Sequence, residues 1–381
     1  MSRRLLYITH HQLNQNNGGA NASKGFLHCL ASLFDEGTVM CHNMKDAKSF
    51  IPQHLVYMPL IDHRSKVRKL VDMYRGIING YYYFVREHLK DQHYDVVVID
   101  HTFSGAGLAA FIKDTGAKLI TIHHNVERDY LRDNSKEKPL LYRWPFLHYS
   151  IKAEKESLQY SNVCLTVTKH DAQVFRSWDI NSHIHHWGIF AYQPIADKVF
   201  KQKPIGYTFI ITGSLYFEQS LRPIIAFIRH YWPLVRQHCP QATLIIAGRN
   251  PSVALQEVCA GTTGITIIAN PANMESVVSK ADYYLCPINT GSGLKLRLFD
   301  GLKQGLPVLC HDVAANGYEA LAEKGCLFTY HDEPSFMTAL DSMLSTTVIP
   351  ANVFGTYQDV FSPETGINRL HSILQKENII T

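Results

Sequence analysis

The chain has 381 residues, more than one ordinary hydrophobic core holds and enough for two domains of about 150–200 residues each. Hydrophobic residues make up 46% and charged residues 18% of the chain, a balance that excludes intrinsic disorder. The formal net charge is +4, and the excess lies in residues 1–200, with 24 Lys and Arg against 19 Asp and Glu. This excess is too small for a typical nucleic-acid-binding protein, so we expect no nucleic acid partner.

The N-terminal segment does not resemble a secretory signal, because its apolar run at 5–9 is too short. The eight cysteines are scattered without a C-x-x-C pair, which favours buried free thiols in a reducing cytosol. His183, His185 and His186 form a cluster with no acidic or cysteine partner nearby in the sequence. We therefore expect no metal site. The cysteines lead us to expect a cytoplasmic protein. The basic first half leads us to expect peripheral contact at the inner face of the cell membrane.

In the first half, short apolar runs alternate with amphipathic segments. The runs predict strands at 4–9, 38–41, 95–100, 118–122, 162–168 and 183–187. The amphipathic segments predict helices at 21–34, 105–115 and about 145–160. The run at 95–100 is continuously apolar, as expected of a strand covered on both faces.

The pattern lapses at 190–206, where we place a linker, and then restarts. Strands are expected at 207–212, 242–247, 265–268, 283–287, 307–310 and 325–330. Helices are expected at 219–239, 273–279, from near 294, at 334–344 and at 363–376. Alternating strands and helices give parallel sheets, so we expect an α/β chain of two Rossmann-like domains. We place these domains at 1–195 and 205–358, with a helix in 359–381 that returns to the first.

Ligands of open parallel sheets bind beyond the carboxyl ends of the strands, which selects the loops to inspect. In the first half, Gly18 and Gly19 stand between a strand and a helix, where a backbone amide could meet an anion or a sugar hydroxyl. An ordinary turn explains the two glycines as well. His124, Asn125 and Glu127 follow the strand at 118–122, and three hydrogen-bonding side chains at this edge favour a site role for His124.

In the second half, glycines stand directly at strand ends. Gly213 and Ser214 follow the strand at 207–212, and Gly248 follows the strand at 242–247. Asn270 follows the strand at 265–268, where main-chain atoms could hydrogen-bond a flat base. Together these loops predict a binding edge on the second sheet.

The loop after the strand at 283–287 carries the strongest signal for an anion. It contains Thr290, Gly291, Ser292 and Gly293 and leads into a helix expected from Leu294. Lys295 and Arg297 would then lie in the first helical turn, where cations are unfavourable against the helix dipole unless an anion is bound. Asp300 would lie on another face, within reach of a ribose or sugar hydroxyl. A solvated helix of mixed charge is the alternative.

These pieces together resemble the GT-B fold glycosyltransferases and are similar to the retaining family 4 group. The resemblance covers nearly the whole chain and is strongest over 207–317. It is carried by 213–215, 240–248, 281–287, 291–300 and 305–308, and in the first half by 18–19 and 124–127.

The resemblance implies two Rossmann-like domains facing across a cleft, with the acceptor on the first and a nucleotide-diphosphate sugar on the second. It implies no metal and no other cofactor. Its catalytic residues would be His124, Lys295 and Arg297. Its donor residues would be Gly213, Ser214, Gly248, Asn270, Thr290, Gly291, Ser292, Gly293, Leu294, Lys295, Arg297 and Asp300. Its acceptor-side residues would be Gly18, Gly19, Asn125 and Glu127.

The activity that the resemblance implies is a hexosyltransferase-like transfer with retention, onto a glycan or lipid-linked acceptor, in cell-surface polysaccharide synthesis. The basic, aromatic segment 62–84 fits a position near a lipid-linked acceptor, and a solvated helix packed on the core explains it equally well.

The chain departs from the family pattern at several positions. Ser292 stands where the family often has an acid, Asp300 replaces a glutamate and Gly301 replaces an alanine. Lys295 and Arg297 also stand in the reverse of the commonest order. A nucleotide-sugar epimerase of the same fold and a non-catalytic nucleotide- or glycan-binding relative therefore remain alternatives.

Overall fold

The computed structural model describes residues 3–15, 17–44, 46–101, 107–134, 139–200, 206–291 and 293–380. Contacts divide the chain into two compact units, one formed by Met1–Ile195 with Phe361–Thr381 and the other by Ala196–Val360. Each unit contains one sheet in which every strand pair is parallel, so the expected α/β fold class is confirmed. Among the described helices, none has both the length and the apolar character that spanning a bilayer requires.

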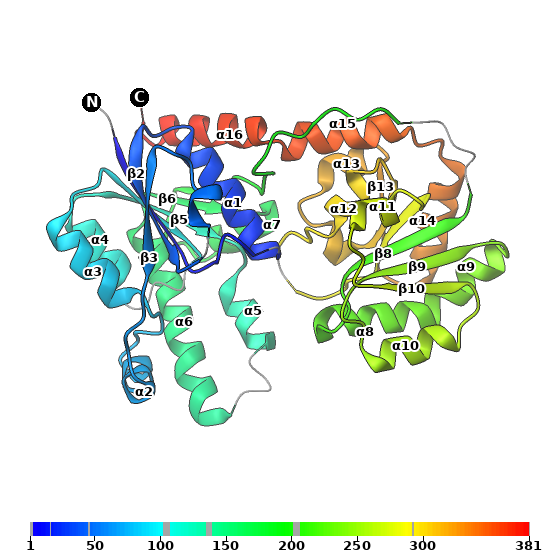
Figure 1. Cartoon of the computed structure of the whole chain (residues 1–381), viewed down its shortest axis with the longest axis horizontal. Coiled ribbons are helices and arrows are strands. Elements are labelled where there is room, and N and C mark those ends of the chain that lie inside the picture. The colour runs from blue at the N-terminus through cyan, green and yellow to red at the C-terminus, as the bar shows by residue number, and fades with distance from the viewer. Residues whose placement is uncertain are drawn as a thin grey trace. The chain divides into compact units, whose positions relative to one another are not determined.

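The sheet of the first unit has seven strands in the order β3-β2-β1-β4-β5-β6-β7 (Figure 1). The strands are β1 (Arg4–Thr9), β2 (Glu36–His42), β3 (Leu55–Leu60), β4 (Val96–Asp100), β5 (Lys118–His123), β6 (Val163–Thr166) and β7 (Ile184–His186). All five residues of β4 are buried, as its continuous apolar run predicts. The chain order reverses between β1 and β4, which makes this the switch point of the sheet.

The helices of the first unit lie on both faces of its sheet. They are α1 (Gly18–Ala31), α2 (Lys66–Tyr74), α3 (Tyr82–Asp91), α4 (Leu108–Asp114), α5 (Glu127–Asn134), α6 (Leu140–Tyr160), α7 (Lys169–Arg176) and α16 (Pro363–Lys376), with a short 3₁₀ turn at Ala47–Ser49. Helix α6 starts five residues before the expected position, and Pro145 lies inside it.

The sheet of the second unit has six strands in the order β10-β9-β8-β11-β12-β13, with its switch point between β8 and β11. The strands are β8 (Thr208–Ser214), β9 (Thr243–Arg249), β10 (Ile265–Ala269), β11 (Tyr283–Cys286), β12 (Val308–His311) and β13 (Leu327–Tyr330). The helices are α8 (Glu218–Ala226), α9 (Trp232–His238), α10 (Val253–Ala260), α11 (Met274–Val278), α12 (Leu298–Leu302), α13 (Glu319–Glu323), α14 (Glu333–Ser345) and α15 (Pro350–Phe361), with a 3₁₀ turn at Asp312–Ala315.

The single helix expected at 219–239 is interrupted by a π-helical segment at Phe227–Tyr231, between α8 and α9. Pro233 explains the interruption, because it has no N–H to donate to the carbonyl four residues earlier, at Arg229. The core of this unit forms around the segment, since Phe227 and Trp232 are both 1% exposed.

The C-terminal helix α16 packs on α1, within the first unit. The indole of Trp187 donates to the carbonyl of Gly366 over 2.9 Å, and Glu377 accepts hydrogen bonds from His183 and His185 over 2.5 and 2.7 Å. These histidines thus have an acidic partner, although none lies near them in the sequence. Glu377 is almost two hundred residues away in the sequence, so local inspection could not find it. All eight cysteines are buried and free, as predicted.

Candidate functional site

The candidate anion site of the second unit lies at the switch point of its sheet. The loops after β8 and β11 leave the same edge there, and ligands of such sheets bind in the crevice between them. Gly213 and Ser214 are the last two residues of β8, and Gly248 also lies inside its strand, β9, so these glycines do not follow the strands as expected. The loop after β11 contains Thr290, Gly291, Gly293 and Leu294. Ser292, which the sequence also assigns to this site, lies outside the described residues.

Two glycines allow the backbone of β8 and β9 to close tightly at this edge. A Cβ at Gly248 would stand 1.9 Å from the carbonyl oxygen of Gly213, so a larger residue cannot fit there. Gly213 itself has φ +143°, and a Cβ on it would stand 2.9 Å from Nη1 of Arg297. Glycine at both positions therefore brings the guanidinium of Arg297 against the end of β8.

Side-chain and backbone oxygens hold the two cations of the loop in place. Arg297 donates from Nη2 to Oγ of Ser220 over 2.6 Å and from Nη1 to the carbonyl of Thr212 over 3.4 Å. The ammonium of Lys295 donates to the carbonyls of Gly291 and Gly293 over 2.9 and 3.2 Å. Arg297 has five N–H donors, so these contacts leave donor capacity for a phosphate oxygen.

The expected helix start near Leu294 was wrong. Helix α12 begins at Leu298, and the chain before it turns through hydrogen bonds from Leu296 to Leu294 and from Leu298 to Lys295. Two buried tyrosines explain the difference: Tyr318 donates to the carbonyl of Lys295 over 2.9 Å, and Tyr284 to that of Arg297 over 2.7 Å. The two cations precede the helix, so the argument from cations inside a first turn does not apply.

Asp300 belongs to a hydrogen-bonded chain with Thr212 and Tyr284. Oδ2 of Asp300 and the hydroxyl of Tyr284 each lie 2.6 Å from Oγ1 of Thr212, and Tyr284 also contacts the carbonyl of Arg297. Thr212 donates to Asp300, and Tyr284 donates to the carbonyl of Arg297. Burial raises the pKa of Asp300.

Asn270 joins the ends of β9 and β10. Its N–H donates to the carbonyl of Gly248 over 2.8 Å, and its Oδ1 accepts from the N–H of Asn250 over 3.0 Å. Asn270 has φ +49°, a left-handed conformation that asparagine adopts more readily than most residues. It follows β10, two strands from β8 and therefore roughly 10 Å from the switch point.

The first unit gathers histidines at its own switch point. His124 lies 2.5 Å from the buried carboxylate of Asp100, measured from Nε2 to Oδ1. Ring centroids of His11 and His101 lie 5.5 and 5.2 Å from that of His124, and His10 lies 4.5 Å from His101. Sequence inspection selected His124 alone from this cluster. The missed signal was that β1, β4 and β5, which are neighbours in the sheet, are each followed directly by a histidine, namely His10, His101 and His124.

The cluster surrounds the buried carboxylate of Asp100 with rings that burial keeps neutral. Burial lowers the pKa of His10 to about 3, of His11 to about 2 and of His101 to about 3. Burial would raise the pKa of Asp100, but His124, His11 and Ser23 together outweigh burial and hold that pKa well below the ordinary value. Nε2 of His11 is buried without a hydrogen-bond partner among the described residues, so a ligand hydroxyl could satisfy it.

Gly18 and Gly19 lie inside α1 and not in a loop before it, which corrects the expected helix start at 21. Asn17 caps the helix by accepting from the N–H of Ala20 over 2.9 Å. A Cβ at Gly19 would stand 2.3 Å from the ring of His11, so this glycine lets His11 lie against the helix.

Glu127 is buried at 2% exposure, and one of its oxygens lies 3.1 Å from Nε2 of His101. Burial raises the pKa of Glu127 to about 7 and that of Glu154 to about 8. Glu154 accepts from the N–H of Glu127 over 2.6 Å and from that of Arg128 over 3.2 Å at the start of α5. These carboxyls hold the segment that carries His124 and Asn125. The described residues include no group of three or more His, Cys, Asp or Glu placed to hold a metal ion.

Known proteins resemble the chain in its second unit by sequence and over its whole length by fold. Residues 206–346 match the model of the family described as Glycosyl transferases group 1. Among curated proteins, no sequence matches the chain. The solved structures named next match at 8–12% identity, which shows the fold alone: the chain has the GT-B fold.

Three of these structures illustrate the likeness. HepE from Anabaena, in complex with UDP and glucose, is 11% identical with a TM-score of 0.65, covering 98% of this chain and 100% of its own. The lipopolysaccharide outer core galactosyltransferase WaaB is 12% identical with a TM-score of 0.64, covering 98% and 99%. TarM from S. aureus, in complex with Fondaparinux, alpha-GlcNAc-glycerol and UDP, is 8% identical with a TM-score of 0.66, covering 97% and 99%.

The contact between Gly301 and Tyr284 gives a test of the packing behind the loop. A Cβ at Gly301 would stand 2.5 Å from Cγ of the buried Tyr284, whereas one at Gly355 in α15 would meet nothing within 4 Å. We expect Gly301→Ala to lower the free energy of unfolding by about 1–3 kcal/mol through overpacking. Gly355→Ala is the matched helical control and should leave stability equal or raise it by up to about 1 kcal/mol. Urea titrations measure both, and equal stabilities for the two variants would contradict the packing described.

Proposed function

We propose that this chain, a glycosyltransferase with a glycosyl transferases group 1 domain and the GT-B fold, transfers a sugar from a nucleotide-diphosphate sugar to a glycan or lipid-linked acceptor. The transfer retains anomeric configuration, needs no metal and serves cell-surface polysaccharide synthesis. The observation that carries the proposal is the pair of cations at the switch point of the matched domain, Arg297 beside Gly213 and Lys295 held by the carbonyls of Gly291 and Gly293. UDP in the HepE and TarM structures supports a nucleotide diphosphate as the leaving group.

The diphosphate is proposed to lie between the end of β8 and the loop after β11. Lys295 and Arg297 offset the negative charge that grows on the leaving phosphate as the glycosidic bond breaks. Backbone amides of Gly213, Ser214, Gly291, Gly293 and Leu294, with the hydroxyl of Thr290, are proposed to complete the phosphate contacts. Because two protein cations perform this charge neutralisation, no divalent metal is required for it.

The nucleoside is proposed to run along the sheet edge from the phosphate towards β10. Asp300 meets a ribose hydroxyl, and the main chain at Asn270 meets the base. The separation of roughly 10 Å between β8 and β10 suits the length of a nucleoside diphosphate. Residue 248 has to be glycine, because any Cβ there would collide with the carbonyl of Gly213. It therefore presents no side chain to the nucleoside.

His124 is proposed as the catalytic group of the first unit, acting on the transferred sugar. Its Nε2 is occupied by Asp100, so Nδ1 is the atom left for a sugar hydroxyl. The buried Nε2 of His11 is proposed as a second hydroxyl partner. In a retaining transfer through an oxocarbenium-like state, the departing phosphate accepts the proton of the acceptor hydroxyl. The residues proposed for the acceptor side are Gly18, Gly19, Asn125 and Glu127. Glu127 acts indirectly, by holding the segment that carries His124 and Asn125.

The lipid-linked acceptor and a peripheral position at the inner face of the cell membrane belong to the same proposal. Their support is the cationic excess of residues 1–200.

Removing the two loop cations tests the donor site. Lys295→Ala with Arg297→Ala should weaken the Kd for a nucleotide diphosphate by roughly 100-fold or more, because each charge-assisted contact contributes about 1.5–3 kcal/mol. Calorimetric titration with UDP, GDP and ADP identifies the nucleotide that the unmodified chain binds and then compares the variants. Lys303→Ala, which removes an exposed cation of the same segment, is the control and should bind as the unmodified chain does. An unchanged Kd in a folded double variant would refute the phosphate assignment.

Two substitutions at residue 124 test the role of Nδ1. Asn places an amide near the position of Nδ1 and Gln near that of Nε2, so His124→Asn should retain more turnover than His124→Gln. His124→Ala should lower kcat by roughly 10²–10³, the usual effect of losing one transition-state hydrogen bond. The Kd for the nucleotide should stay constant in all three variants, and His170→Asn, at an exposed histidine, is the control. Full turnover by His124→Ala would exclude a catalytic role.

A further inference from the structure

Helix α2 has an apolar face that the described part of its unit leaves exposed. Val67, Leu70, Val71 and Tyr74 recur at the spacing that normally marks the buried face of a helix. These side chains are instead 73%, 52%, 41% and 46% exposed. Only Asp72 and Met73 of this helix are buried. The face is amphipathic in sequence but lacks a covering surface among the described residues.

The start of α6 extends this apolar area. Leu140, Leu141, Tyr142 and Trp144 are 79%, 82%, 41% and 64% exposed. The hydroxyl of Tyr74 donates to the carbonyl of Leu141 over 2.9 Å, so the two groups are neighbours. Figure 1 shows α2 and the start of α6 at the same end of the first unit. We call the eight residues, Val67, Leu70, Val71, Tyr74, Leu140, Leu141, Tyr142 and Trp144, the apolar surface.

Cations outnumber carboxylates beside the apolar surface. Residues 62–75 contain five Lys and Arg and two Asp. Asp62 pairs with Arg64 and Lys69, and Asp72 pairs with Arg64 and Arg68. Among the described residues, Lys66 and Arg75 form no ion pair, and both are exposed. The surface therefore combines large apolar side chains with uncompensated positive charge.

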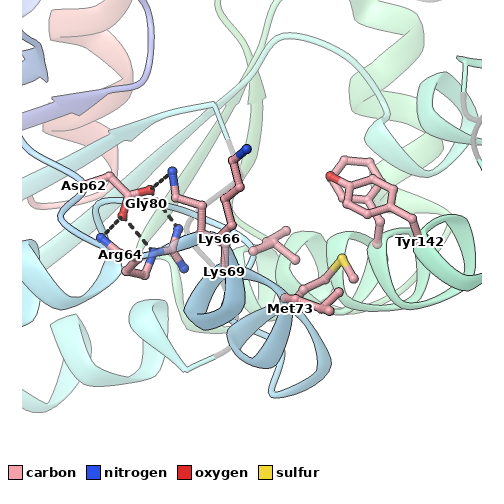
Figure 2. A pocket seen from close by; sticks show the side chains of 10 residues that line it. Asp62, Arg64, Lys66, Lys69, Met73, Gly80 and Tyr142 are labelled. Carbon is pink, nitrogen blue, oxygen red and sulfur yellow. Dashed lines mark hydrogen bonds and ion pairs between the residues drawn. The ribbon is translucent and has the colours of Figure 1, made fainter.

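A pocket of about 400 Å³ opens beside this surface. Its polar lining comes from Asp62, Arg64, Lys66 and Lys69, and its apolar lining from Leu70, Met73, Ile78, Tyr142 and Phe146. Figure 2 shows Asp62 bound to Arg64 and Lys69, with Tyr142 across the pocket from these side chains. A pocket with one cationic wall and one apolar wall suits the phosphate of an amphiphile.

We propose that the apolar surface docks onto an anionic lipid bilayer, with the pocket accepting the phosphate of one anionic lipid. The apolar side chains enter the boundary between headgroups and acyl chains, and Lys66 and Arg75 meet the negative surface. A second copy of the chain fits less well, because a symmetric contact would bring the uncompensated cations of both copies together. The proposal deepens the proposed function, on which it rests for the lipid-linked acceptor.

Vesicle co-sedimentation of the full chain tests the proposal. The unmodified chain should bind vesicles of phosphatidylcholine with roughly one third phosphatidylglycerol, and bind phosphatidylcholine alone at least tenfold more weakly. Val67→Ser, Leu70→Ser, Leu141→Ser and Trp144→Ser together should reduce binding at least tenfold. Lys66→Ala with Arg75→Ala should reduce it roughly 25-fold, about fivefold for each cation. The controls, Val253→Ser with Ile349→Ser and Lys280→Ala with Lys324→Ala, change exposed residues of the second unit and should bind like the unmodified chain.

Absence of binding to the anionic vesicles, or unchanged binding by the two surface variants, would overturn the proposal. So would a dimer in analytical ultracentrifugation that the apolar substitutions abolish while no vesicle binding occurs, since a second copy would then occupy the surface. Calorimetry with the nucleotide diphosphate keeps the two proposals separate. Surface variants should retain nucleotide affinity, and loss of nucleotide binding with intact vesicle binding would count against the donor site alone.

Discussion

The close approach of the Gly213 backbone to its neighbours is the constraint on which the second unit's site depends. Its carbonyl fills the space of any side chain at residue 248, and its Cα faces the guanidinium of Arg297. Gly301 is needed for the same steric reason, because a Cβ at this position would overlap the ring of Tyr284. Tyr284 in turn holds the carbonyl of Arg297. Glycines thus close the ends of β8 and β9 beside the guanidinium of Arg297, and the proposed anion site rests on this packing.

A buried carboxylate has the corresponding role in the first unit. Asp100 is fully buried and accepts hydrogen bonds from Tyr7, Ser23 and His124. Its charge fixes the orientation of the His124 ring, while burial keeps the surrounding histidines neutral. One oriented imidazole at a switch point, beside unionised rings, can hydrogen-bond a neutral sugar hydroxyl.

Sequence periodicity located most strands because continuous apolar runs such as β4 belong to strands buried on both faces. It missed β3, an edge strand whose middle residues are not buried. The glycines at the strand ends were found because they stand next to such runs. The start of α12 was misplaced because the hydroxyls of Tyr284 and Tyr318 hold that segment through tertiary contacts. The histidine cluster joins residues far apart in the chain, so only the strand order reveals it. Helix α2 shows a further limit of prediction from sequence. Residue spacing identifies the apolar face of a helix, but it does not show which surface covers that face.

Incubation of the chain with a panel of nucleotide-diphosphate sugars, with and without EDTA, tests the central claim most directly. The account predicts release of the nucleotide diphosphate from one donor, with slow hydrolysis without acceptor and transfer with retained anomeric configuration once an acceptor is supplied. EDTA should leave the rate unchanged. Interconversion of the sugar without release of nucleotide would instead identify an epimerase, and binding without turnover a non-catalytic protein. Either result, or a rate abolished by EDTA and restored by a divalent cation, would contradict the account.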